Sequence, residues 1–123
     1  MILVDARHED LFPELPASFL ARLAELAPDD ADRANAIVRA LPAVDDLPLT
    51  VISHGPADWI SEAFGLGQGD LDRAEAAWQQ YQRELVTRSH GSKCCVAGAS
   101  GHLIPVDQPE LVVREIHSLI DRC

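Results

Sequence analysis

The chain has few aromatic residues, few cysteines and half as many basic as acidic side chains. Only 5% of its 123 residues are aromatic, and 20 Asp and Glu against 10 Lys and Arg leave a formal net charge of −10. Nucleic acid and anionic membranes would repel such a chain, so we expect neither as a partner. It also lacks the run of roughly 18 apolar residues that a membrane-spanning helix needs.

The three cysteines fit neither a disulfide framework nor a zinc site. Cys94 and Cys95 are adjacent and Cys123 stands alone, so no C-x-x-C spacing exists. An odd count without a framework is typical of a reducing, intracellular setting. The polar residue Asp5 follows only four residues, which does not suit a signal peptide. These features predict a cytoplasmic protein.

Two further patterns have the residue types of a cofactor or metal site without its spacing. Gly65, Gly67 and Gly69 do not form G-x-G-x-x-G and follow no strand, so we expect no phosphate cradle. The triplet at 8–10, His-Glu-Asp, has no matching partner cluster and reads as a polar loop. We therefore predict no cofactor and no bound metal.

Apolar β-type runs alternate with helical patterns along the chain. The runs lie at 1–4, 47–53 and 94–97, and the helical patterns at 16–27, 30–41, 70–88 and 110–122, with Asp70 as the cap of the third. This alternation is typical of an α/β fold with a parallel sheet and right-handed crossovers. Three apolar strands alone would expose both sheet edges, so we expect part of a larger sheet that can self-associate through an exposed edge.

His102 is the first candidate for a functional residue. The run at 94–97, typical of a buried strand, ends in the small-residue turn 98–101, which leads directly to this histidine. Pro109-Glu110 then suits the start of a helix. Because α/β folds bind ligands beyond the carboxyl ends of their parallel strands, His102 is well placed to act on one.

Four blocks of sequence carry a resemblance to a known family. They are 2–5 with 8–10, the helical segment 13–42, 47–52 with 55–58, and 98–102 with 107–112. In this order they resemble the C-terminal portion of a serine-type α/β-hydrolase: the sixth strand, the cap, the seventh strand with its G-x-x-D exit, and the G-x-G-H…P-E-x-V segment. The resemblance covers essentially the whole chain. It implies one partial α/β-hydrolase domain over 1–123, with about three parallel strands, flanking helices and a cap-like helical hairpin at 13–42.

The resemblance also implies roles for individual residues. The family's triad runs Ser, then Asp or Glu, then His along the chain, so His102 takes the place of the catalytic base. Two residues compete for the acid: Asp58, which ends the G-x-x-D motif, and Asp5, which ends the first strand. We interpret His54 and His117 as structural or exposed, and Trp78 as part of the core.

The nucleophile has no counterpart in these 123 residues. The family's G-x-S-x-G elbow and oxyanion-hole loop would both precede Met1. Ser100 stands in a similar string but follows the strand of His102 and lies two residues from it, so it cannot serve as the elbow. We expect an ester or amide hydrolase of small apolar substrates, inactive without a serine supplied from elsewhere. The alternative is a non-catalytic remnant that acts as a binding or interaction module.

Overall fold

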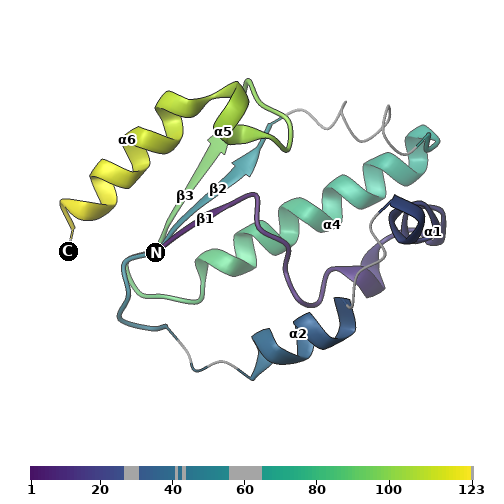
Figure 1. Ribbon diagram of the computed structural model, residues 1–123, viewed down its shortest axis with the longest axis horizontal. Helices are drawn as coiled ribbons and strands as arrows, with labels where there is room; N and C mark the ends of the chain where they lie inside the picture. The colour runs from purple at the N-terminus through teal and green to yellow at the C-terminus, as the bar shows by residue number, and fades with distance from the viewer. Residues whose placement is uncertain (27–30, 41, 43, 56–64, 123) are drawn as a thin grey trace.

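The computed structural model describes residues 1–26, 31–40, 42, 44–55 and 65–122. Within them one parallel sheet has the strand order β1-β2-β3, formed by β1 (Ile2–Val4), β2 (Thr50–His54) and β3 (Lys93–Ala97) (Figure 1). The α/β class with a parallel sheet is confirmed. β2 begins later than the run at 47–53 predicted, and it includes His54.

Helices cover both faces of the sheet. The helices in the described ranges are α1 (Ala17–Leu26), α2 (Ala31–Arg39), α4 (Gln68–Val86), α5 (Ile104–Asp107) and α6 (Pro109–Ile120), with a short 3₁₀ turn η1 (Phe12–Glu14). The long helix α4 lies on one side of the sheet and α6 on the other, and both contact the central strand β2 (Figure 1). The short helix α5 was not predicted. It occupies the link between β3 and α6.

The central strand is buried on both faces because its side chains alternate between two cores. Ile52 packs with Ala97, Ile104 and Leu111 in a core that includes α5 and α6. Val51 points the other way and packs with Leu49 and with Leu85 of α4. All five residues of β2 are buried, as expected for a strand with a neighbour on each side.

A third core joins α1 to α4. Leu11, Leu15 and Phe19 pack against Leu71, Ala74 and Tyr81. The predicted helices at 16–27 and 30–41 are present as α1 and α2, and residues 27–30 between them are outside the described part of the chain. Their pairing as a cap-like hairpin stays a prediction.

Two expectations need correction. β3 is not a buried strand: Cys94 is exposed and Val96 is 58% exposed, because β3 is an edge strand with one open face. Helix α4 begins after Gly67, so Asp70 lies in its first turn, where its charge suits the positive helix end, rather than at the cap.

Self-association through a sheet edge stays a prediction. No helix in the described ranges is long and apolar enough to cross a membrane.

Candidate active site

The carboxyl ends of the three strands bring Asp5, His54 and His102 together. Asp5 directly follows β1, His54 is the last residue of β2, and His102 follows the turn after β3. The imidazole Nδ1 of His102 lies 2.6 Å from Oδ2 of Asp5. Asp5, one of the two predicted acids, is therefore in contact with His102, and the other, Asp58, lies outside the described residues.

Asp5 is a buried carboxylate that accepts hydrogen bonds from several donors. It is 3% exposed and lies against His102, His54 (Nδ1 to Oδ2, 2.8 Å) and the indole N–H of Trp78 (2.9 Å). Burial alone would raise the pKa of Asp5, but the hydrogen bonds from His102, His54 and Trp78 outweigh it and hold the pKa well below its usual range. Its φ of 44° is also uncommon for a residue other than glycine. Asp5 is therefore a fixed negative charge.

His54 lies between two carboxylates in the interior. It is fully buried, its Nδ1 faces Asp5, and its Nε2 lies 2.9 Å from Oε2 of Glu75 on α4. Because a carboxylate oxygen only accepts, each ring nitrogen carries a hydrogen and the ring is an imidazolium. Burial would lower the pKa of His54, but the hydrogen bonds and charges of Asp5 and Glu75 raise it to about 9. Gln79 in turn donates to Glu75 across 2.8 Å.

His102 reaches Asp5 on a loop that packs tightly against Gly55. The Gly55 N–H donates to the carbonyl of Ser100 across 2.9 Å. A Cβ at Gly55 would lie 2.7 Å from the Ala97 carbonyl oxygen and 2.8 Å from the Gly98 Cα, closer than real contacts allow. The absence of a side chain at 55 thus lets the loop approach. The side chain of His102 is 45% exposed. Its ring meets the Trp78 ring edge-on, with 6.0 Å between the two ring centres.

The Asp5–His102 pair fixes which nitrogen of His102 is basic. Since Asp5 only accepts, Nδ1 of His102 carries the hydrogen, which leaves Nε2 as the unprotonated nitrogen of the neutral ring. Such a ring can take a proton at Nε2 and be stabilised as an imidazolium by the buried carboxylate. This arrangement is suited to general acid–base chemistry.

Sequence reasoning missed the roles of His54, Glu75 and Trp78. His54 could have been found by the positional argument used for His102, because it also ends a parallel strand. Glu75 and Trp78 are three residues apart on α4 and so share a helix face, but nothing in the sequence shows which face meets Asp5. Trp78 is only partly buried, and it donates to Asp5 as well as packing at the edge of a core.

Ser100 is buried and makes its hydrogen bonds close to the loop that carries His102. It is 2% exposed, and its Oγ lies 2.8 Å from the Gly101 carbonyl oxygen and 3.1 Å from Oδ2 of Asp107, so its one hydrogen can be donated to either acceptor. These contacts give Ser100 a structural role.

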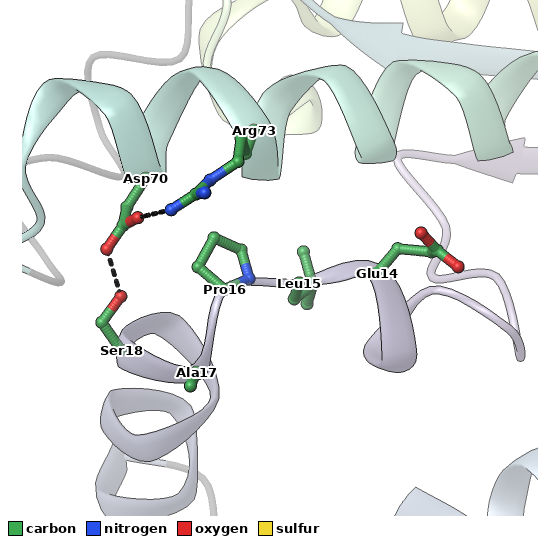
Figure 2. A pocket seen from close by; sticks show the side chains of 7 residues that line it. All are labelled: Glu14, Leu15, Pro16, Ala17, Ser18, Asp70 and Arg73. Carbon is green, nitrogen blue, oxygen red and sulfur yellow. Dashed lines mark hydrogen bonds and ion pairs between the residues drawn. The ribbon is translucent and has the colours of Figure 1, made fainter.

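Two cavities lie along the segment that leads into α1. One, of about 520 Å³, is lined by Asp5 and His102 together with apolar side chains from η1, α1 and the segment between them. The other, of about 450 Å³, lies between the turn at 14–18 and the first turns of α4 (Figure 2). Asp70 borders it, accepts a hydrogen bond from the Ser18 hydroxyl across 2.5 Å and accepts another from the Arg73 guanidinium. Only the first cavity contains the candidate site residues.

The side chains of His8, Glu9 and Asp10 contact two guanidinium groups. Their potential ligand atoms lie within 4.8 Å of one another, and both His8 and Glu9 are buried. Arg88 donates to Glu9, and its Nη2 lies 3.0 Å from Nε2 of His8. Arg39 donates to Oδ1 of Asp10 across 2.5 Å. Both carboxylates of the triplet are therefore paired with arginines of the protein itself.

Comparisons with known proteins add no relatives. A scan against protein-family models, a search of curated proteins and a search of solved structures each gave no match.

Proposed function

We propose that this chain supplies the acid and the base, Asp5 and His102, of an α/β-hydrolase triad that cleaves ester or amide bonds. The 2.6 Å contact between Nδ1 of His102 and Oδ2 of Asp5 carries the proposal. A buried carboxylate there meets a half-exposed imidazole at the carboxyl end of a parallel sheet. The four sequence blocks that resemble the family support His102 as the base and leave the acid open between Asp5 and Asp58.

In the proposed reaction His102 moves the proton and Asp5 keeps it oriented. Nε2 of His102 takes the proton from a serine hydroxyl as the serine oxygen attacks the carbonyl carbon. The resulting imidazolium then gives that proton to the leaving alcohol or amine as its bond to the carbonyl carbon breaks. Water then attacks the acyl-serine carbonyl carbon while Nε2 of His102 takes a proton from the water. His102 returns that proton to the serine oxygen as the acyl bond breaks and the carboxylic acid is released. Throughout, Asp5 accepts from Nδ1 and stabilises the positive ring.

His54 and Glu75 act as positioning residues. Nδ1 of the His54 ring contacts Oδ2 of Asp5, the oxygen that His102 also contacts, and Nε2 of the same ring contacts Glu75. The row Glu75, His54, Asp5 alternates in charge, so the negative charge of Asp5 is retained in the interior. A fixed acceptor of this kind restricts the orientation of the His102 ring.

The serine and the oxyanion-hole donors are proposed to come from residues outside the 123 of this sequence, in the same polypeptide or in another. The sequence holds no G-x-S-x-G motif. We therefore expect the 123-residue chain alone to hydrolyse nothing. Asp58 stays the competing acid, because it ends the G-x-x-D motif.

The test joins the chain to its missing part. The coding sequence before Met1 and the neighbouring reading frames are read for G-x-S-x-G, and any segment found is expressed with this chain and treated with a serine-directed fluorophosphonate. We expect labelling of a serine outside residues 1–123 that is lost in His102→Ala and Asp5→Asn and kept in the control His117→Gln.

Two results would overturn the proposal. The first is serine labelling that persists in His102→Ala, or that occurs on the 123-residue chain alone. The second is the absence of any G-x-S-x-G segment from the genomic neighbourhood, which would favour the non-catalytic binding module instead.

A further inference from the structure

The cavity beside His102 is built mainly from apolar side chains. Its volume is about 520 Å³, within the range of roughly 300–1,000 Å³ typical of small-molecule sites. Phe12 of η1, Phe19 and Leu23 of α1 and Trp78 of α4 line it. The polar residues in its lining are Asp5, Arg7 and His102. A mainly apolar lining with a few polar groups is typical of a site that binds a small molecule.

Aromatic side chains are concentrated in this wall. In the part of the chain that the structure describes, the Phe and Trp residues are Phe12, Phe19 and Trp78, and all three line this cavity. The guanidinium of Arg7, which also lines the cavity, lies 4.8 Å from the centre of the Phe12 ring. Rings from separate elements favour an aromatic ligand, because aromatic pairs gain energy beyond the area they bury.

We propose that this cavity binds an aromatic group of the substrate. This group is attached within a few atoms of the ester or amide carbonyl at which His102 acts as the base. A dry cavity of about 150 Å³ holds one benzene ring, so this larger and open one accommodates a ring with its linker, about ten carbon atoms. The link to hydrolysis rests on the proposed function. The binding of the aromatic group does not, since it needs neither serine nor proton transfer.

The test measures binding to the 123-residue chain by NMR, using three stable amides: 3-phenylpropanamide, hexanamide and acetamide. We expect 3-phenylpropanamide to shift the indole N–H signal of Trp78 and the methyl signals of Leu23 in a saturable way. Hexanamide should bind about threefold or more weakly, and acetamide should cause no saturable shift. Equal responses to 3-phenylpropanamide and acetamide would overturn the inference.

Two variants and a control link the binding to this cavity. Leu23→Trp fills the cavity and should weaken 3-phenylpropanamide binding at least tenfold. Ile37→Trp places the same ring on exposed α2, away from the cavity wall, and should leave binding unchanged. Phe12→Leu removes one ring and should reduce the preference for 3-phenylpropanamide over hexanamide. Unchanged binding in Leu23→Trp, with an intact amide spectrum, would contradict the proposal.

The failure of this inference differs from the failure of the proposed function. Aromatic binding without any His102-dependent serine labelling would leave the cavity assignment standing and remove the hydrolase. Serine labelling that depends on His102, with no preference for the aromatic amide, would keep the hydrolase and remove the aromatic substrate.

Discussion

His54 donates from Nδ1 to Oδ2 of Asp5 across 2.8 Å, although 49 residues separate the two in the sequence. Both side chains are essentially inaccessible to solvent, at 0% and 1% exposure. Removing one partner of such a pair leaves an uncompensated charge in the interior, which commonly costs about 3–5 kcal/mol. The pair therefore joins the first two strands electrostatically at the point where the candidate site begins.

The first prediction concerns the pH dependence of stability. The folded-state pKa of His54 is raised from 6.5 to about 9, so its contribution is fully present below pH 6.5 and is lost as the pH rises through about 9. The linked free energy of unfolding is roughly 3 kcal/mol. Urea unfolding between pH 6.5 and 9.5 measures it. His54→Gln should flatten this decline, and His117→Gln on the exposed surface of α6 should not. Equal slopes in the wild type and His54→Gln would contradict the assignment.

The second prediction isolates Glu75. Because the hydrogen bond and charge of Glu75 help to raise the pKa of His54, Glu75→Gln should lower that pKa and move the stability loss to lower pH. NMR titration of the His54 ring measures the pKa directly. Asp72→Asn, on the exposed side of the same helix, is the matched control and should leave it unchanged. A His54 pKa that is the same in Glu75→Gln and the wild type would show that the two residues do not interact in solution.

The third prediction concerns the close approach at Gly55. A Cβ there would meet the backbone of Ala97 and Gly98 at 2.7–2.8 Å, while a Cβ at Gly98 would meet nothing within 4 Å. Gly55→Ala should therefore destabilise the chain by about 1–3 kcal/mol and move the His102 ring signals. Gly98→Ala should change stability by less than about 0.5 kcal/mol. Denaturant unfolding and NMR test both variants, and equal effects would refute the steric argument.

The fourth prediction tests the guanidinium at His8 and Glu9. Glu9 is 8% exposed, and the hydrogen bond and charge of Arg88 lower its pKa against the opposing effect of burial. Arg88→Gln should cost about 1–3 kcal/mol because Glu9 loses its charged partner. Arg83→Gln, exposed on α4, is the control.

We also expect Zn²⁺ to leave the melting temperature of the wild type unchanged. A rise in that temperature would contradict the prediction that the chain binds no metal.

The sequence predicted the positions that depend on local pattern. The alternation of runs gave the α/β class, and the turn after residues 94–97 singled out His102. The choice between Asp5 and Asp58 stayed open because each follows a strand, and the contact between Asp5 and His102 joins residues 97 positions apart, which no local pattern predicts. The charge of His54 was not predictable for the same reason, since it depends on Glu75 from a helix 21 residues away. Helix α5, with four residues, is too short for a periodic signal.

The central claim is that Asp5 orients His102, and the tautomer of His102 tests it most directly. In ¹⁵N NMR of the neutral ring we predict a hydrogen on Nδ1 and none on Nε2. Asp5→Asn should abolish this strict preference, while Asp58→Asn should leave it intact. A neutral wild-type ring protonated on Nε2, or a preference lost in Asp58→Asn and kept in Asp5→Asn, would contradict the account.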